Sequence, residues 1–235
     1  MKFLALRSLQ PEIMDVERPP LERLEKIYRF LKFANQALGS TRALRSELGR
    51  FSTRWPHDRP VRILDVATGM ADVPRGLADW ARRKGKSLRI VGLDLEKDTL
   101  SLARRETADY PEIELVEGDA RALPFADGAF DYVITNHFFH HLKDEEVVAL
   151  LRRFDRIASR GIVVVDLLRR IRLYLWMHLF TRFSDPIVRH DGLLSVRKSF
   201  TLDEIRAVAH RAGLGYLKAR AVFGHRFVLS GEKGD

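Results

Sequence analysis

Short apolar runs alternate with helical patterns through the middle of the chain. The runs cover residues 61–68, 88–95, 113–117, 130–135 and 161–167. Because their apolar residues are nearly continuous, we expect strands that are buried on both faces of a parallel sheet. Residues 73–84, 97–109 and 144–158 lie between most of these runs and have apolar residues at three- and four-residue spacing. This order predicts an α/β sheet with right-handed crossovers.

Further elements are predicted on both sides of these runs. Residues 21–38 form a helical pattern that Gly39 ends, and Ser40 or Thr41 is expected to cap a second short helix. Residues 54–60, with two prolines, indicate a linker. At the other end, a capping-box sequence starts a helix over 201–212, and residues 216–223 and 226–230 predict a closing pair of strands.

Composition narrows the class of protein. With 235 residues, 46% of them hydrophobic and 31% charged, the chain fits one large globular domain. It has no cysteine, which excludes disulfides, thiolate metal sites and cysteine nucleophiles. The first apolar run is too short for a signal peptide, so we expect a cytoplasmic protein.

Charge is unevenly distributed along the chain. The net charge of +9 combines 12 basic and 7 acidic residues in 1–60, 12 and 17 in 61–151, and 17 and 8 in 152–235. An acidic middle between basic ends argues against one continuous duplex-binding face, although it allows an anionic substrate or a membrane surface.

The first predicted strand leads into a loop that favours a cationic ligand. A dinucleotide needs a glycine-rich turn and a helix start without negative charge, but this loop has Gly69 as its one glycine, with Asp65 before it and Asp72 after it. These carboxylates disfavour a nicotinamide cofactor. S-adenosylmethionine carries a sulfonium and an ammonium group and no phosphate, so it fits the loop better.

The next two strand ends supply matching hydrogen-bond acceptors. Asp94 ends the second strand, where a carboxylate can accept both ribose hydroxyls, and Asp119 follows the third, where it can accept the adenine amino group. Asp72 itself is best explained by helix capping. Ligands of open α/β sheets bind at this carboxyl edge.

Several motifs together resemble a known family. The stretches ILDVATGMAD, VGLDLEKDTLSLAR and EGDARALPFADGAFDYVITNHFFHHL are similar to class I S-adenosylmethionine-dependent methyltransferases. Residues 123–131, LPFADGAFD, are most similar to the ubiquinone/menaquinone-biosynthesis type. The resemblance covers about 61–168, whereas the flanks match weakly.

This resemblance implies a fold, a cofactor and a set of contacts. We expect a Rossmann-like, seven-stranded, mostly parallel sheet with helices on both faces, a C-terminal antiparallel strand and an N-terminal helical cap. The cap and linker would cover 1–60, and the S-adenosylmethionine-binding domain 61–235 with a lid at about 169–200. The implied cofactor contacts are Asp65, Ala67, Thr68, Gly69, Asp94, Leu95, Asp119, Ala120 and Asn136. Ala67 and Ala71 stand where the family usually has glycine.

Histidines gather after the fourth strand, at the same sheet edge. His137 and His140 are candidates for a general base or for orienting the acceptor, because a histidine with an ordinary pKa suits neutral pH. His141 resembles a position that packs in the family. No His/carboxylate set has the sequence spacing of metal ligands, so we predict no metal site.

Two later segments bear on the acceptor. His190-Asp191 is a second candidate catalytic pair within 185–198, although a loop stabilised by a turn at Gly192 explains the same residues. Residues 171–183 are apolar with arginines around them, and are too short to span a bilayer. They predict a core helix, a lid over a hydrophobic acceptor, or a helix that contacts a membrane surface.

The leading hypothesis is methyl transfer to a small apolar aromatic, quinol or polyketide-like acceptor. Oxygen is the favoured target because the histidines could serve a phenol, and carbon methylation of a quinol precursor is the near alternative. A nucleic-acid methyltransferase fits the net charge, but no RNA-binding module is recognisable. A non-catalytic cofactor-binding partner of another enzyme is the remaining alternative. The sequence leaves the oligomeric state open.

Overall fold

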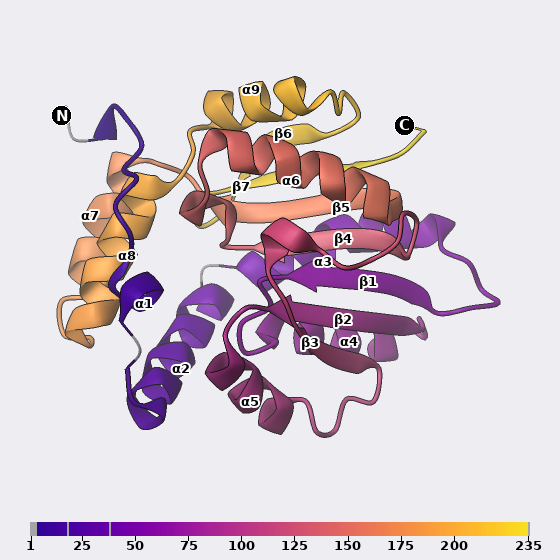
Figure 1. Ribbon diagram of the computed structural model, residues 1–235, viewed down its shortest axis with the longest axis horizontal. Coiled ribbons are helices and arrows are strands. Elements are labelled where there is room, and N and C mark those ends of the chain that lie inside the picture. The colour runs from indigo at the N-terminus through magenta and orange to yellow at the C-terminus, as the bar shows by residue number, and fades with distance from the viewer. Residues whose placement is uncertain (1–3, 18, 38, 235) are drawn as a thin grey trace.

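A mixed sheet organises the protein in the computed structural model, which describes residues 4–17, 19–37 and 39–234 (Figure 1). Its seven strands follow the order β3-β2-β1-β4-β5-β7-β6. The first five are parallel, whereas β7 runs antiparallel to β5 and β6. The strands are β1 (Val61–Val66), β2 (Leu88–Asp94), β3 (Ile113–Glu117), β4 (Phe130–Asn136), β5 (Ala158–Leu167), β6 (Lys218–Val222) and β7 (Arg226–Glu232). This architecture confirms the predicted Rossmann-like fold.

Helices surround the sheet and cover one of its ends. They are α1 (Ile13–Val16), α2 (Leu21–Ala37), α3 (Ser40–Phe51), α4 (Asp72–Arg83), α5 (Lys97–Glu106), α6 (Asp144–Ile157), α7 (Ile171–Phe180), α8 (Pro186–Lys198) and α9 (Leu202–Ala212). Three short 3-10 turns join them to the strands: η2 (Ser52–Arg54), η3 (Ala120–Ala122) and η4 (Phe139–His141).

Both faces of the sheet are buried, which explains the continuous apolar runs. On β4, Val133 packs into a core with α6 and α9, while its neighbours Tyr132 and Ile134 pack on the opposite face with α3 and α4. Helix α3 contributes Leu44 and Leu48 to this second core. The division at residue 60 stays a prediction, and α3 shares its core with the strands beyond it.

The predicted N-cap agrees with the structure at α9 and differs from it at α3. At α9, the Thr201 hydroxyl accepts the Glu204 amide at 3.3 Å and the Glu204 carboxylate accepts the Thr201 amide at 2.8 Å, which confirms the capping box. The expected cap at Ser40 or Thr41 is wrong. Gly39, with φ of 81°, is the N-cap of α3, and Ser40 is already helical. The expected last residue of the preceding helix, position 38, lies outside the described residues.

Helices α1, α2, α7 and α8 lie together beyond one end of the sheet (Figure 1, left). The loop interpretation of residues 185–198 is wrong, because they form α8. Asp185 caps this helix by accepting the Ile187 amide at 2.8 Å. Gly192 lies inside this helix, where it faces α7. A Cβ at this position would stand 3.3 Å from Met177 Sδ, so glycine allows α7 to pack closely.

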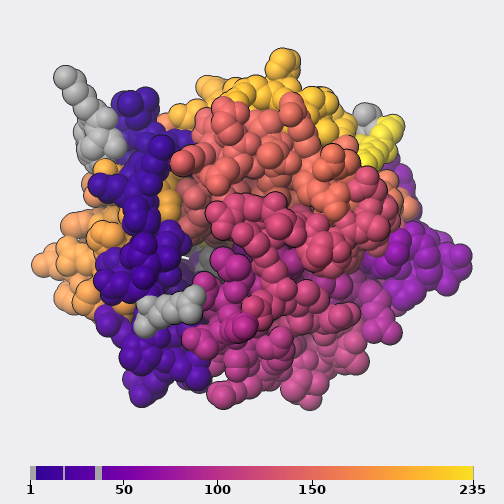
Figure 2. Space-filling model, in the orientation of Figure 1, coloured from indigo at the N-terminus to yellow at the C-terminus, as the bar shows by residue number. Residues whose placement is uncertain are grey.

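The N-terminal segment crosses α8 and is tied to it at several points. Residues 4–17, called the strap below, lie against α7 and α8 along one side of the molecule (Figure 2). The Ser8 amide donates to the Arg197 carbonyl at 3.0 Å. Further along, the Asp191 carboxylate accepts the amides of Ile13 and Met14 at 2.8 and 3.0 Å, capping α1.

Within residues 4–17, 19–37 and 39–234, every helix is too short or too polar to cross a bilayer.

Candidate functional site

The loop after β1 is shaped by hydrogen bonds and by left-handed backbone. Thr68 Oγ1 donates to Asp65 Oδ2 at 2.7 Å and folds the loop back over the strand. This fold requires Gly92 on β2, because a Cβ there would lie 2.8 Å from Thr68 Oγ1. Ala67 and Ala71 have φ of 59° and 55°. Both alanines therefore hold a conformation that glycine adopts without strain.

A cavity of about 220 Å³ opens at this loop, and we call it the strand-end cavity. Its walls come from the carboxyl ends of β1, β2 and β4 and from α2. They are Tyr28, Leu31, Lys32, Asp65, Ala67, Thr68, Gly69, Met70, Asp72, Val73, Asp94, Asn136 and His137. The structure thus gathers most of the residues expected to contact a cofactor.

The other expected contacts lie at neighbouring strand ends, outside the lining of this cavity. Leu95 follows β2 and is 54% exposed. Asp119 and Ala120 follow β3, where the Asp119 carboxylate pairs with the Arg121 guanidinium at 2.9 Å. Hydrogen bonds from Arg121 hold the pKa of Asp119 below its usual range, so this carboxylate is an ionised acceptor.

Burial raises the pKa of both Asp65 and Asp94, but their hydrogen-bond partners differ. Burial raises the pKa of Asp65 to about 8, against the hydrogen bond from Thr68, and nearby Asp72 and Asp94 raise it further. Burial also raises the pKa of Asp94, but its oxygens accept the amides of Gly69 at 2.8 Å and Glu96 at 3.1 Å. A cationic ligand beside Asp65 would favour its ionised form.

Two buried oxygens in this cavity match the polar groups of S-adenosylmethionine. In the part of the chain that the structure describes, Asp65 Oδ1 and Asn136 Oδ1 have no hydrogen-bond partner. Buried acceptors normally find a partner, so these atoms indicate donors supplied by a ligand. The cofactor offers an ammonium group for Asp65 and ribose hydroxyls for Asp94. The residues present therefore fit the cofactor.

A second cavity, of about 160 Å³, adjoins the first, and we call it the apolar cavity. It lies among the strap, α2, α7 and α8. Its walls are Glu12, Met14, Ile27, Phe30, Leu31, Ala34, His137, Leu167, Met177, Thr181, Val188, Asp191, Gly192, Ser195 and Arg226. Leu31 and His137 line both cavities, so the two spaces meet at these side chains.

His137 is fixed in one orientation and kept neutral. Its Nε2 lies 2.8 Å from Ser40 Oγ and accepts the Nε–H of Arg226 at 3.3 Å. Burial, helped by the charge of Arg226, lowers the pKa of His137 to about 3. This differs from the expectation of a histidine with an ordinary pKa. A neutral ring whose Nε2 accepts from Arg226 suits orientation better than proton abstraction.

His140 lies behind His137 and is paired with a buried carboxylate. Its Nδ1 lies 2.7 Å from Asp166 Oδ1, and Asp166 Oδ2 accepts the His140 amide at 3.0 Å. Burial opposes ionisation of Asp166, but His140 and His137 lower the pKa of this carboxyl to about 2. The same carboxylate lies 3.9 Å from His137 Nδ1, so it links the two histidines.

The other candidate pair, His190 and Asp191, lies on α8 beside the apolar cavity. His190 is on α8 with a side chain that is 53% exposed, and its Nδ1 lies 2.8 Å from Asp191 Oδ1. Asp191, unlike His190, lines the apolar cavity. The hydrogen-bond distance shows that the two side chains of this pair are in contact. The catalytic role of His190 stays a prediction.

Two charged residues of this site were not predicted from the sequence. Glu12 lies on the strap and Arg226 on β7, both far from the motifs. Arg226 is 1% exposed, and burial lowers its pKa to about 10 against the attraction of Asp166. Its place at the start of an apolar strand was the one available signal, since buried arginine is uncommon.

Part of the chain resembles known methyltransferases in sequence. Residues 63–161 match the family described as a methyltransferase domain. The demethylmenaquinone methyltransferase of Bacillus licheniformis is 34% identical over 120 residues, which are 48% of this chain and 50% of that protein. The chain therefore spans about half the length of the curated relatives it matches.

Solved structures extend the likeness in fold to most of the chain. A SAM dependent methyltransferase from Aquifex aeolicus has a TM-score of 0.61 at 13% identity, covering 92% of this chain and 99% of that one. The magnesium protoporphyrin IX methyltransferase of Synechocystis PCC 6803, solved with bound SAH, has a TM-score of 0.63 at 14% identity. That match covers 91% of this chain and 94% of the other.

The chain thus has a methyltransferase-like fold, and the part of it that carries the strand-end cavity resembles a methyltransferase domain. Among curated proteins, the relatives it resembles include demethylmenaquinone methyltransferases.

Proposed function

We propose that this protein methylates an oxygen of a small apolar acceptor that carries an acidic hydroxyl, such as a phenol, a quinol or a polyketide enol. The meeting of the two cavities at His137 carries the proposal. One cavity has acidic and amide acceptors for a cationic cofactor, and the other has apolar walls. Methyl transfer requires a donor and an acceptor to be aligned at such a junction.

On the donor side, the chain supplies binding and orientation. Asp94 would accept the ribose hydroxyls, Asp65 the ammonium group, and Asn136 would lie near the sulfonium at the end of β4. When bound, S-adenosylmethionine supplies a methyl group on a positively charged sulfur. Tyr28 would cover this side, because it lines the cavity and its hydroxyl is fixed by the hydrogen bond from Thr99 Oγ1 at 3.1 Å.

On the acceptor side, a buried positive charge stands in an apolar wall. Phe30, Met177 and Val188 would exclude water from a ring, while the Arg226 guanidinium would favour an ionised oxygen. A buried cation stabilises an oxyanion more strongly than water-exposed groups do. Because Arg226 lowers the cost of ionisation, no histidine with an ordinary pKa is required beside the oxygen.

The histidines then have distinct proposed roles. His137 would orient the acceptor oxygen, since it lines both cavities and is held by Ser40 and Arg226. His140 is a positioning residue that acts through Asp166. His190 would act through Asp191, which reaches the apolar cavity.

Carbon methylation of a quinol precursor is the second candidate. The relatives named demethylmenaquinone methyltransferase support a quinol-related acceptor, although each match covers 48% of this chain. An ionised hydroxyl beside Arg226 activates the adjacent ring carbon as well as the oxygen. Product analysis is therefore needed to separate the two.

Incubation of the purified protein with methyl-deuterated S-adenosylmethionine and a panel of phenols, quinols and enols tests the proposal. We expect formation of S-adenosylhomocysteine together with an O-methyl product identified by mass spectrometry and NMR. A C-methyl product would favour the second candidate. The absence of transfer to every acceptor, from protein shown to bind the cofactor, would contradict both.

Variants of Arg226 test the acceptor side. Arg226→Gln should lower kcat/KM at least tenfold and move the rise of activity to higher pH, because the acceptor hydroxyl ionises less readily. Arg226→Lys keeps the charge and should lose less. Equal losses in the two variants, without a shift of the pH profile, would contradict the role of the charge.

A further inference from the structure

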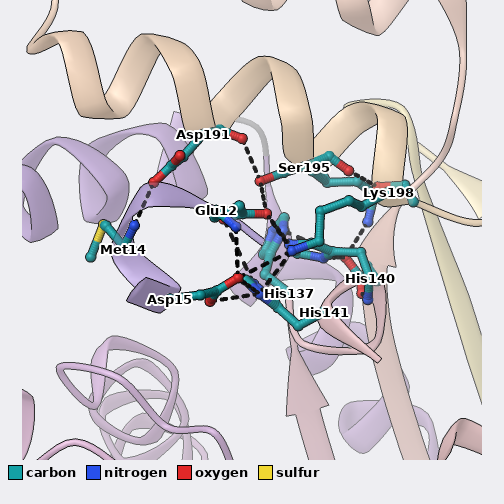
Figure 3. Close-up of polar contacts among 12 residues, drawn as sticks. Glu12, Met14, Asp15, His137, His140, His141, Asp191, Ser195 and Lys198 are labelled. Atoms are coloured by element: carbon teal, nitrogen blue, oxygen red, sulfur yellow. Dashed lines mark hydrogen bonds and ion pairs between the residues drawn. The ribbon is translucent and has the colours of Figure 1, made fainter. Parts of the chain in front are cut away.

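Three potential metal ligands come together beside the apolar cavity. Glu12 from the strap meets His140 and His141 of η4, and one ligand atom from each residue lies within 4.8 Å of the others (Figure 3). Glu12 and His140 are buried and His141 is half-buried. The sequence could not show this set, because Glu12 stands far from the two histidines along the chain.

The two imidazoles turn the same ring nitrogen toward Glu12. His140 Nδ1 is engaged by Asp166 at 2.7 Å, and His141 Nδ1 lies 3.2 Å from Asp15 Oδ1. Their Nε2 atoms lie 3.8 and 3.9 Å from the Glu12 carboxylate oxygens. These separations are too long for hydrogen bonds. They are near the roughly 3.3 Å between neighbouring ligands of a tetrahedral ion with bonds of about 2.0 Å, so a small adjustment would suffice.

Neighbouring groups already orient each of the three side chains. A histidine that ligates a metal almost always donates its other nitrogen to a carboxylate or carbonyl, as the pairs with Asp166 and Asp15 allow. On Glu12, Oε1 accepts the Ser195 hydroxyl at 2.9 Å and lies 3.3 Å from Lys198 Nζ. Oε2 is on the side of His141. Oε1, the oxygen that Ser195 and Lys198 hold, is thus the one nearer His140 Nε2, while Oε2 faces His141 Nε2.

Charge around the cluster favours an added cation. The carboxylates of Glu12, Asp15 and Asp166 stand around it. Among the described residues, they outnumber the one ammonium group in contact with them, that of Lys198, which lies 3.3 Å from the first two carboxylates and 3.4 Å from His141 Nδ1. Two imidazoles and one carboxylate are ligands that Zn²⁺ and similar transition-metal ions prefer, whereas Mg²⁺ and Ca²⁺ prefer oxygen.

We propose that Glu12, His140 and His141 bind one divalent transition-metal ion, with Zn²⁺ as the representative. The ion would join the strap to η4 and so hold Glu12 in the wall of the apolar cavity. Metal binding at this site does not depend on the proposed methyl transfer, and it can be measured without any acceptor.

Titration of tag-free protein, first treated with a chelator, tests the site. We expect calorimetry with Zn²⁺ to show one ion per chain, and Co²⁺ to give the visible absorption bands of a low-coordinate site with nitrogen ligands. Glu12→Gln and His141→Asn should each weaken Zn²⁺ binding at least tenfold. His210→Asn, on the exposed side of α9, is the matched control and should bind as the unaltered protein does.

Folding of each variant is checked by circular dichroism and by calorimetry with S-adenosylhomocysteine. Absence of one-to-one binding by the unaltered protein would overturn the site whatever the variants do. Binding that survives Glu12→Gln in a folded protein would equally overturn it. If the protein bound metal but failed to transfer methyl groups, the site would stand and the proposed function would fall.

Discussion

Asp65 lies beneath the loop after β1, where burial favours its protonated form while its predicted ligand favours the ionised one. Because its pKa is about 8, the protonated and ionised forms of Asp65 interconvert close to neutral pH. Ala71, in the same loop, shows a second local cost, since it holds a left-handed φ of 55° without being glycine. Such local costs gather at sites where a ligand must fit.

Cofactor affinity should depend on pH through Asp65. Below about pH 8 this carboxyl is protonated in the free protein, and a bound cation would drive its ionisation, so binding releases a proton. The Kd for S-adenosylmethionine should therefore fall as pH rises from 6 to 8 and level off above that. Asp65→Asn cannot ionise and should bind more weakly with a flatter profile. Identical slopes in both proteins, measured by calorimetry, would contradict this account.

Relief of the backbone strain at Ala71 should stabilise the fold. A left-handed alanine costs about 1–2 kcal/mol, and the greater freedom of glycine in the unfolded chain offsets about 0.4–1 kcal/mol of that. Ala71→Gly should therefore raise the free energy of unfolding by up to about 1.6 kcal/mol in urea titrations. Ala103→Gly, inside α5, is the control and should lower it. Destabilisation by both changes would show that Ala71 is not strained.

His140 should influence turnover more than cofactor binding. In its proposed role it acts through Asp166, which lies between it and His137, and it does not line the strand-end cavity. His140→Asn should lower kcat at least tenfold while the Kd for S-adenosylmethionine changes less than threefold. A parallel loss in both quantities would assign His140 to general packing instead.

At the scale of elements, periodic segments were predictable and close packing was not. The strands and the capping box of α9 follow from local sequence, because apolar continuity and a Thr–Glu pair each have one dominant structural cause. Helix α8 was missed because Gly192 resembles a turn residue. Its role is to admit Met177 of α7, a contact that only the tertiary structure reveals.

Helix α7 is apolar on two sides, and we expect its outer side to contact an anionic membrane surface. Leu173 and Met177 are buried on its inner side. On the outer side, Leu175 and Leu179 are 59 and 70% exposed, and Phe183, just beyond the end of the helix, is 94% exposed. Exposed Arg172 and Arg182 flank this outer side and complement negative headgroups. Because α7 also lines the apolar cavity, such contact would bring a lipophilic acceptor near its site.

Sedimentation with lipid vesicles tests this contact. The protein should sediment with phosphatidylglycerol vesicles more than with phosphatidylcholine vesicles, and Leu179→Ser combined with Phe183→Ser should abolish the difference. Phe223→Ser removes a phenylalanine that is 81% exposed in the β6–β7 connection, and it should leave vesicle binding unchanged. Equal effects of the two changes would rule out a specific role for α7.

At the scale of the whole molecule, the two halves of the site differ in how far the sequence could predict them. The strand-end cavity is built from contiguous motifs at three neighbouring strand ends, so Asp65, Asp94 and Asn136 could be placed in advance. The apolar cavity is assembled from the strap, α2, α7, α8 and β7. Glu12, Arg226 and His137 line this cavity together because segments that are far apart in the sequence pack against one another. No periodic pattern in the sequence predicts such packing.

The central claim is that the strand-end cavity binds S-adenosylmethionine. Calorimetry with S-adenosylmethionine and with S-adenosylhomocysteine tests it. We predict one site per chain for each ligand. Asp94→Ala should weaken binding about tenfold or more, as expected for lost hydrogen bonds to a charged group of about 1.5–3 kcal/mol. No heat with either ligand, or affinity that is unchanged in Asp94→Ala, would contradict the account.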